Sequence, residues 1–388
     1  MSTDPIPSLA FPRAEFEERV RRVREGLQAR GLDAGIFAAA ETLYYLTGYE
    51  SPSHFGFQLL VMPVDQGPFV VIRQHMASGV RAESWLQDIV TFPDTGDPIE
   101  TTRQALAERK LAGRRLAFEA TAPPLTLQTA RGLEAALGTG PLADCAGIVE
   151  ALRLVKSARE VEYVRQAAHI SDVGMEAARS VIREGVTELE IAAEATRQMT
   201  LAGGEYQASP LVVGIQERTR LAIPLPTGRR LGKGEVLWIE VFGTVRRYSA
   251  GLKAIFGATP ASDDALRRAE VARRALQRAV AAIAPGRPAS VVPETVQETF
   301  RDAGYTEGAY HQSGYSIGIA FAPNPHEARM LSLRRGNTTP LAAGMTLFPI
   351  ANLYGPGPIS SASLMVVVTP SGAEVLTRFT PSSSDLAR

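Results

Sequence analysis

The stretch GEVLWIEVFGTVRRYSAGLKAIF, residues 234–256, decides the fold of the second half of this chain. Its first part is an apolar run that ends at a single carboxylate, Glu240. Gly243 then leads into a second apolar segment that begins at Tyr248. Segments rich in β-branched and aromatic residues that follow a glycine-containing turn are typical of strands. The stretch therefore predicts a β-hairpin whose first strand is buried on at least one face.

Glu240 is the unusual residue of this hairpin, because its neighbours are Trp238, Ile239, Val241 and Phe242. A carboxylate among apolar side chains loses hydration, which raises its pKa unless a cation or hydrogen-bond donors hold the charge. Two interpretations follow. Glu240 is a functional group in a partly dry site, or the alternation of the strand points it to solvent at a sheet edge.

The length and composition of the chain indicate a globular protein with two domains. Its 388 residues are enough for two separate cores, since single cores stop growing near about 250–300 residues. The 41 basic and 41 acidic residues cancel, so no net field favours a nucleic acid or an acidic membrane. The single cysteine, Cys145, has no internal disulfide partner, which fits a reducing compartment, and its small and apolar neighbours indicate a packed residue.

The sequence carries no pattern typical of an export signal or a membrane span. The N-terminal residues MSTDPIPSLAFP lack a basic region followed by a long apolar run, and no apolar run approaches the ~18–20 residues that cross a bilayer. We therefore expect a soluble cytoplasmic protein with no nucleic-acid partner and no membrane partner.

Residues 1–150 predict an α/β domain with a largely parallel sheet, because apolar runs alternate with segments of helical spacing. Residues 1–11 are rich in proline and predict an arm over the surface or over a partner subunit. The predicted strands are residues 34–39, 57–63, 68–73, 88–93 and 115–119, and the predicted helices are residues 12–30, 41–46, 99–110 and 125–136.

Residues 151–380 predict an α+β domain, because helices and strands are segregated along the sequence. The predicted helices are residues 152–185, 187–202, 263–283 and 291–303, the second starting at a capping box of Thr187 and Glu190. Besides the hairpin, the predicted strands are residues 209–214, 315–321, 345–350, 363–369 and 373–377. The tail, residues 381–388, is predicted to be disordered.

Six motifs in a fixed order give the chain a resemblance to a known family. They are LTGYE (46–50), RLVKSAREVEYVRQAA (153–168), LGKGEVLWIE (231–240), HQSGYSIGI (311–319), LAAGMTLFPI (341–350) and VVVTPSGAEVLT (366–377). In this order they resemble the pita-bread family of Xaa-Pro dipeptidases, aminopeptidase P, methionine aminopeptidase and creatinase. The resemblance implies a creatinase-like N-terminal domain, a pita-bread C-terminal domain with its site inside a curved sheet, and a homodimer.

The chain departs from this family at the metal ligands. Peptidases of the family hold two divalent metals with two aspartates, a histidine and two glutamates. The matching positions in this sequence are Glu240, Gly251, Tyr315, Ile350 and Ser363. Divalent ions need several oxygen or nitrogen donors, which glycine and isoleucine side chains do not supply. We therefore expect no metal and no other cofactor.

Members of the family without metals suggest the closest pattern. The resemblance implies side-chain chemistry on a C–N bond, as in creatinase. Glu240, residues 314–318 (GYSIG) and residues 322–330 (APNPHEARM) are most similar to the pattern of ectoine hydrolase. The chain differs from that enzyme in its last strands, which contain NLYGPGPISSAS instead of a glutamate and acidic-aromatic residues.

The candidate catalytic residues are Glu240, His326 and Tyr315. Glu240 is a general base toward water or a nucleophile, and His326 is a second acid–base group. Tyr315 stands at the position of the metal-binding histidine, where its hydroxyl orients substrate or stabilises an oxyanion. For each of the three a structural role is the alternative: a solvent-facing glutamate, a surface histidine and a core tyrosine.

The candidate substrate-binding residues are His311, Glu327, Arg329 and His54. His54 follows LTGYE in a loop that, by the resemblance, reaches a partner subunit. Basic residues around the hairpin are further candidates for a substrate carboxylate, although most are expected to be solvated. They are Arg218, Arg220, Arg246, Arg247 and Lys253.

The sequence thus favours a metal-independent hydrolase of a C–N bond in a small molecule or short peptide. The first alternative is a non-catalytic protein that keeps the pocket for binding. The second is a conventional Xaa-Pro dipeptidase, which conflicts with the missing ligands.

Overall fold

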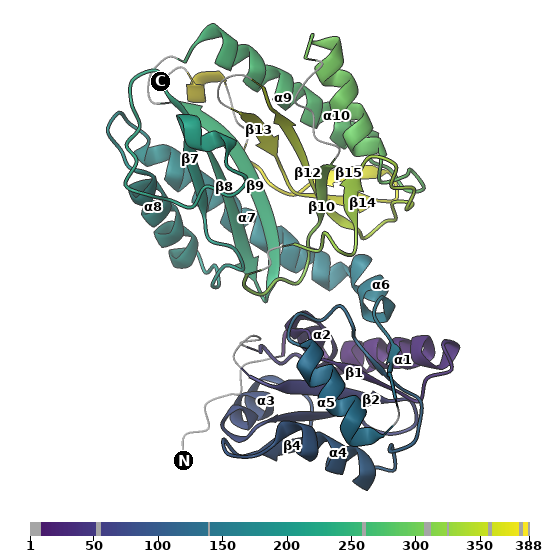
Figure 1. The fold of residues 1–388 in the computed structure, drawn as a ribbon. Coiled ribbons are helices and arrows are strands. Elements are labelled where there is room, and N and C mark those ends of the chain that lie inside the picture. Colours follow the sequence, from purple (N-terminus) through teal and green to yellow (C-terminus); the bar gives the residue numbers. More distant parts are fainter. Residues whose placement is uncertain are drawn as a thin grey trace. The chain divides into compact units, whose positions relative to one another are not determined.

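The chain forms two compact units, Met1–Arg153 and Leu154–Arg388, in the computed structural model (Figure 1). The structure describes residues 9–51, 56–138, 140–257, 261–305, 312–323, 326–355, 359–379 and 383–386. Each unit has its own sheet and its own core, and each is described separately below.

The N-terminal unit is built around a six-stranded sheet, counted over the described residues, with strand order β4-β3-β2-β1-β5-β6. Its strands are β1 (Ala34–Phe37), β2 (Gln58–Pro63), β3 (Phe69–Arg73), β4 (Ile89–Phe92), β5 (Leu116–Phe118) and β6 (Ala143–Asp144). Its helices are α1 (Arg13–Ala29), α2 (Ala40–Thr47), α3 (Ala77–Glu83), α4 (Pro98–Glu108), α5 (Leu127–Leu137) and α6 (Ile148–Leu154), and a 3₁₀ turn, η1, covers Gln74–Met76. The predicted α/β class of this unit is confirmed.

The expectation of a largely parallel sheet is wrong for this unit. Strand β2 runs antiparallel to both β1 and β3, while β1 pairs with β5, β3 with β4 and β5 with β6 in parallel. The short turn at residues 64–67 accounts for the antiparallel pairing of β2 with β3, since so short a connection can only join antiparallel neighbours. Cys145 is fully buried, and burial raises the pKa of its thiol.

The C-terminal unit contains a strongly bent sheet of nine strands over the described residues. The main order is β11-β10-β12-β13-β9-β8-β7, with β14 on β12 and β15 on β14. The strands are β7 (Val212–Ile215), β8 (Val236–Val245), β9 (Tyr248–Gly257), β10 (Gln312–Ser316), β11 (Ser332–Arg334), β12 (Thr346–Leu353), β13 (Ser360–Ser363), β14 (Val366–Thr369) and β15 (Gly372–Val375). The helices are α7 (Ala158–Val181), α8 (Glu188–Leu201), α9 (Asp263–Ala282) and α10 (Val291–Asp302), with 3₁₀ turns η2 (Gln216–Arg220) and η3 (Ser383–Leu386).

Two helix pairs cover the outer side of this sheet. Helices α7 and α8 pack on strands β7, β8 and β9 through a core that contains Ile191, Leu237 and Leu252 (Figure 1). Helices α9 and α10 pack on β12 and β13 through a second core that contains Leu347, Ala351 and Ala362. Because side chains alternate between the two faces of a strand, residues next to these core positions lie on the opposite, inner face.

The central hairpin is long and regular, as predicted. Ten residue pairs join β8 and β9, from Val236 with Gly257 to Val245 with Tyr248. Its turn is made by Arg246 and Arg247, with φ of 48° and 61°. A turn of two left-handed residues matches the twist of a hairpin, although glycine or asparagine usually supplies it. Gly243 permits the close approach of α7, since a Cβ there would lie 2.2 Å from the Ala167 oxygen.

Several predicted elements differ from the structure. The single helix expected over residues 152–185 is two helices, α6 and α7, because Ser157 caps a new helix with Glu160 in a capping box. Strand β10 ends at Ser316, and the strand expected over residues 363–369 is split into β13 and β14. The prediction of a disordered tail is wrong for residues 383–386, which form η3, and Leu386 is buried against Val236 and Ile255.

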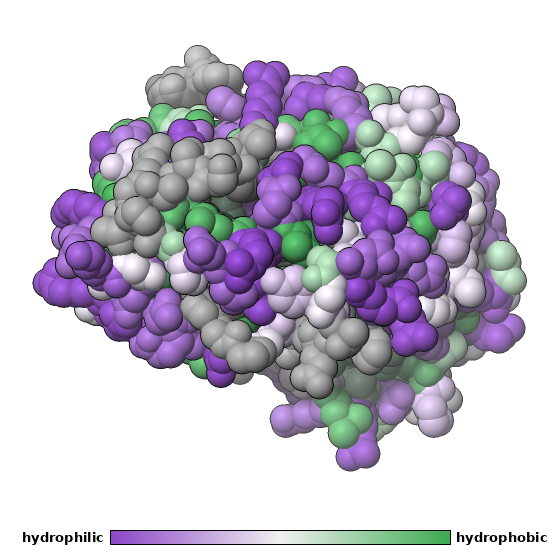
Figure 2. All heavy atoms as spheres, turned by 90° about the horizontal axis from the view of Figure 1, so that it is seen from above, coloured by the Kyte–Doolittle hydropathy of each residue, from purple (hydrophilic) through white to green (hydrophobic). Residues whose placement is uncertain are grey.

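The helices that the structure describes do not meet the requirements of a membrane span. None of the helices in the described part of the chain combines the length and the apolar character that crossing a bilayer requires. The face seen in Figure 2 is mostly hydrophilic, with hydrophobic residues in small groups.

The Ser157 cap yields a first prediction. Ser157→Ala removes the hydroxyl that accepts the Glu160 amide, so the free energy of unfolding should fall by about 1 kcal/mol. Urea denaturation followed by circular dichroism measures the change. Ser180→Ala is the control on the same helix: it removes an exposed hydroxyl that donates only to the Ala177 oxygen of its own helix, and should lower stability by less than about 0.5 kcal/mol. Equal losses in both variants would contradict the assigned cap.

Candidate active site

One row of side chains crosses four strands on the inner face of the C-terminal sheet. Glu240 of β8 pairs with Lys253 of β9, Lys253 pairs with Ser363 of β13, and Ser363 pairs with Ile350 of β12. Directly opposed residues of antiparallel strands point to the same face. The four residues Glu240, Lys253, Ser363 and Ile350 are called the inner row below.

The neighbours of the inner row confirm which face it occupies. Ile239 and Val241 flank Glu240 and belong to the core under α7 and α8. Ala351 and Ala362 flank Ile350 and Ser363 and belong to the core under α9 and α10. The inner row therefore faces away from both cores, and Glu240 and Ile350 are partly exposed there.

Glu240 is a half-buried acid in the middle of the sheet. Burial raises the pKa of its carboxyl group, and the positive charge of Lys253 acts in the opposite direction. Within the described part of the chain the carboxyl group makes no hydrogen bond and no ion pair. Its place between β7 and β9 rules out the alternative in which Glu240 points to solvent at a sheet edge.

Lys253 is the cation of the inner row. The residue is 7% exposed, and its ammonium nitrogen lies 3.7 Å from the ring centroid of Trp238. Burial lowers the pKa of the ammonium group, and Glu240 opposes that shift. Among the described residues it has no hydrogen-bond or ion-pair partner. The Trp238 ring therefore stabilises the charge through a cation–π contact without neutralising it.

The structure brings Tyr315 and His326 together beside this row. Their ring centroids are 4.3 Å apart. Burial raises the pKa of Tyr315 well above its usual value, and the charge of Glu240 adds to this shift, so the phenol stays protonated. Burial lowers the pKa of His326, and its Nδ1 accepts the Ala328 amide at 3.3 Å. His326 is therefore neutral near pH 7, with Nε2 as its donor.

Glu327 is a buried residue that forms an ion pair inside the protein. Its carboxylate accepts from Lys156 Nζ at 2.6 Å and from Ser316 Oγ at 2.8 Å. The side chains of Lys156 and Glu327 are 1% and 2% exposed. A carboxylate enclosed in this way has no surface for a ligand, so we no longer interpret Glu327 as a substrate-binding residue.

Of the other substrate-binding candidates, the structure describes only Arg329. Arg329 is exposed, and its positive charge contributes to the lowered pKa of His326. His54 and His311 lie outside the described residues, so their roles stay predictions.

Two arginines expected to be solvated are structural. Arg247 is 1% exposed and donates to the backbone oxygens of Tyr206 and Ala320. Arg218 forms an ion pair at 2.9 Å with the fully buried carboxylate of Glu188 and donates to the Leu225 oxygen.

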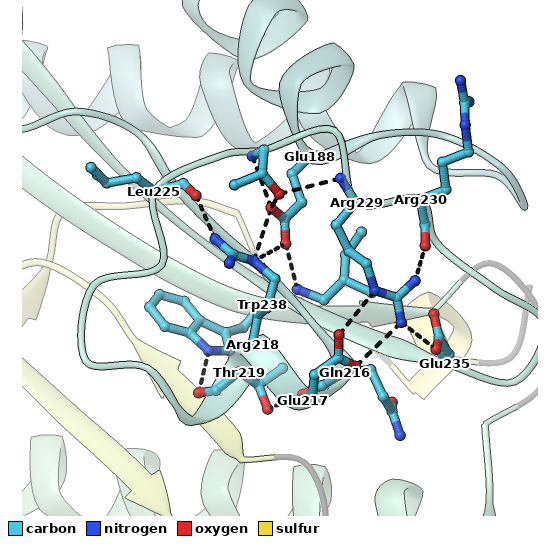
Figure 3. Close-up of polar contacts among 12 residues, drawn as sticks. Glu188, Gln216, Glu217, Arg218, Thr219, Leu225, Arg229, Arg230, Glu235 and Trp238 are labelled. Atoms are coloured by element: carbon cyan, nitrogen blue, oxygen red, sulfur yellow. Dashed lines mark hydrogen bonds and ion pairs between the residues drawn. The ribbon is translucent and has the colours of Figure 1, made fainter.

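Figure 3 shows how this Arg218 network supports the inner face. Glu188 also accepts from the Thr227 amide and hydroxyl, which fastens the loop between η2 and β8 to the start of α8 (Figure 3). Trp238 Nε1 donates to the Thr219 oxygen, which lies in η2 beside Arg218, at 2.9 Å. The network therefore fixes the ring that lies under Lys253.

Comparisons with known proteins identify the family of this chain. Residues 162–370 match metallopeptidase family M24, and residues 19–155 match the creatinase/prolidase N-terminal domain. The chain belongs to family M24 and has its pita-bread fold. It is 30% identical to an uncharacterized hydrolase/peptidase, y4tM, of Sinorhizobium fredii over 95% of this chain and 97% of that protein.

Solved structures share the fold at low sequence identity. Dipeptidase PepE from Mycobacterium ulcerans superimposes with a TM-score of 0.81 at 24% identity, over 95% of this chain and 97% of that chain. A prolidase from Thermococcus sibiricus gives 0.85 at 19% identity, over 95% and 98%. The N-terminal domain of FACT complex subunit SPT16 from Cicer arietinum gives 0.77 at 16%, over 96% and 98%.

The residues of this site do not fit the metal centre that the family name implies. The described residues include no group of three or more His, Cys, Asp or Glu side chains placed to hold a metal ion. The inner row instead contains one carboxylate, an ammonium group, a hydroxyl and an aliphatic side chain. An ammonium group repels a divalent cation, and one carboxylate cannot bridge two of them.

Aromatic rings occupy the space beside Gly251, the position of a family aspartate. A Cβ on Gly251 would lie 2.7 Å from Phe348 Cε2 and 2.9 Å from Phe242 Cε1. The Phe348 ring also packs on Tyr315, with centroids 5.8 Å apart. A carboxylate cannot enter this position unless the rings move.

The sequence interpretation missed the partnership of Lys253 with Glu240 and the packing of Phe348 on Gly251. A usable signal existed for Lys253. In a hairpin closed by a two-residue turn, the two residue numbers of every opposed pair add up to the same value. A turn at Arg246 and Arg247 therefore places Lys253 opposite Glu240. No glycine or asparagine marked that turn, so the register stayed undetermined.

The Lys156–Glu327 pair yields a second prediction. Glu327→Gln leaves a buried ammonium group without its counter-ion and should lower the free energy of unfolding by about 3 kcal/mol, measured by urea denaturation. Glu374→Gln removes a similar pair with Arg165 whose side chains are 45% and 41% exposed, and should change stability by less than about 1 kcal/mol. Comparable small losses in both variants would contradict a structural role for Glu327.

Gly251 yields a third prediction. Gly251→Ala forces a methyl group into the Phe348 ring and should cost about 1–3 kcal/mol of stability, seen as a lower thermal midpoint. Gly228→Ala is the matched control, since a Cβ there meets nothing within 4 Å. A Gly251→Ala midpoint equal to that of the control would show that the rings leave room for a side chain.

Proposed function

We propose that the protein is a hydrolase of a C–N bond in a small molecule or short peptide and that it acts without a dinuclear metal centre. The observation that supports this best is Glu240, a half-buried carboxyl group without a hydrogen-bond or ion-pair partner among the described residues, beside a protonated phenol and a buried cation. An acid with a raised pKa is suited to exchanging protons near neutral pH.

In the proposed reaction Glu240 is the general base. It takes a proton from water, and the resulting hydroxide adds to the carbon of the amide or amidine. The Tyr315 hydroxyl donates a hydrogen bond to the oxygen or nitrogen that gains negative charge. Protonated Glu240 then returns the proton to the leaving nitrogen, and neutral His326 orients the substrate through Nε2. The C–N bond breaks and one water is consumed.

Two alternatives keep specific support. The structures of a dipeptidase and a prolidase share this fold, so cleavage of Xaa-Pro dipeptides belongs in any substrate screen, together with ectoine and creatine. A non-catalytic binding protein is favoured by the Phe348 ring, which fills space beside Gly251. We further propose that the protein is a cytoplasmic homodimer. Light scattering of the purified protein measures its molar mass and so tests whether it is a dimer.

The fourth prediction concerns Glu240. Glu240→Gln keeps the size of the side chain and removes the base, so turnover should fall by at least about 100-fold. The wild-type rate should resist a chelator and should decrease as the pH falls through the raised pKa of Glu240, because the base must be ionised. The measurement is hydrolysis of the screened dipeptides, ectoine and creatine, with and without chelator.

Glu270→Gln, an exposed change on α9, is the matched control and should keep full activity. Unchanged turnover in Glu240→Gln would refute a catalytic Glu240. Turnover of a dipeptide that a chelator abolishes would mean that the protein is a metal-dependent dipeptidase. No turnover of any compound would favour the binding protein.

A further inference from the structure

Lys253 and Ser363 are two hydrogen-bond donors of the inner row that the proposed reaction does not use. Lys253 is a buried cation that, among the described residues, lacks a hydrogen-bond or ion-pair partner, and it is paired with Ser363 across adjacent strands. Ser363 is 2% exposed, and its Oγ has no hydrogen-bond partner among the described residues.

A buried polar group without a partner is unfavourable by about 1–3 kcal/mol, and more if it is charged. Two such groups on neighbouring strands, facing the same way, therefore indicate a position that a ligand completes. An ammonium group offers three donors and a hydroxyl one. A carboxylate, with two oxygens and about four acceptor positions, satisfies both groups at once.

The residues next to Lys253 indicate which other groups a ligand with a carboxylate should carry. Glu240 lies on the other side of Lys253 in the inner row, and Trp238 lies beneath the ammonium group. A second carboxylate near Glu240 would be repelled, whereas an N–H group or a cationic nitrogen would be attracted. The site therefore suits a small molecule that presents a carboxylate to Lys253 and an N–H or cationic nitrogen to Glu240.

We propose that Lys253 and Ser363 form a carboxylate-binding subsite on the inner face, at the place where the family's peptidases hold metals. The ammonium group holds the ligand's carboxylate and so places the adjoining C–N bond beside Glu240. The choice of Glu240 as the reacting group rests on the proposed function, but binding of the carboxylate does not.

The Trp238 ring supplies a direct readout of this subsite. The chain has two tryptophans, Trp85 and Trp238, so Trp85→Phe leaves the ring beneath Lys253 as the only tryptophan emitter. In this background the protein is titrated with sodium acetate at constant ionic strength. Acetate is a small carboxylate whose only other group is a methyl group. Its binding therefore tests the contact with the carboxylate alone. Acetamide, a neutral molecule of the same shape, is the matched ligand control.

The fifth prediction is that acetate changes the Trp238 emission in a saturable way and acetamide does not. Lys253→Met should weaken acetate binding by about tenfold or more, because it removes a charge-assisted hydrogen bond, and Ser363→Ala should weaken it by a smaller factor. Lys253→Arg should retain binding. Lys233→Met, which removes an exposed lysine, should bind acetate as the parent protein does.

Three results would overturn the subsite: acetate that does not saturate the parent protein, acetamide that binds as well as acetate, or Lys253→Met that binds acetate as well as its parent. Circular dichroism of each variant shows that a loss of binding is not a loss of fold. The subsite and the proposed function fail separately. Saturable acetate binding without turnover of any screened compound supports the subsite and favours the binding protein over the hydrolase. Turnover without acetate binding supports the hydrolase and overturns the subsite.

Discussion

The inner face of the C-terminal sheet depends on one cross-strand pair, Glu240 with Lys253. Placing two opposite charges on adjacent strands among aromatic rings is favourable only when each reduces the cost of burying the other. The directions of their pKa shifts express this balance, since burial raises the pKa of the acid and lowers that of the base, while each charge opposes the shift of its partner. In the proposed reaction Glu240 supplies the base, and Lys253 supplies a positive charge beside it, where a metallopeptidase places a metal ion.

The rest of the unit holds this pair in place from outside the site. The apolar cores under α7–α8 and α9–α10 fix the two halves of the sheet and leave its inner face to the polar row. The buried Lys156–Glu327 pair joins the segment before α7 to the residue that follows His326. The Glu188–Arg218 ion pair fixes η2, whose Thr219 oxygen accepts from the Trp238 ring. None of these residues belongs to the inner row. Substituting them should therefore affect the site by displacing the side chains of the inner row and the Trp238 ring.

The sequence predicted the family, the two fold classes and most helices and strands, because hydrophobic periodicity and capping residues are local signals. It did not predict which side chains meet across the sheet. Lys253 became the partner of Glu240 only through a register set by an Arg-Arg turn, and Phe348 reached Gly251 only through the pairing of distant strands. Glu327 had the appearance of a ligand residue beside His326, and only the fold revealed that Lys156 encloses it. The local rules carry no information on such contacts.

The replacement of the family's metal centre by the Glu240–Lys253 pair is the central claim, and elemental analysis of purified, undialysed protein tests it most directly. Mass spectrometry of manganese, cobalt, iron and zinc, on wild type and on Glu240→Ala, measures bound metal per chain. We expect no stoichiometric metal in the wild-type protein, because one carboxylate, an ammonium group and a hydroxyl are a poor ligand set. About two equivalents per chain, lost on Glu240→Ala, would contradict it and restore a dinuclear site of the kind used by metallopeptidases.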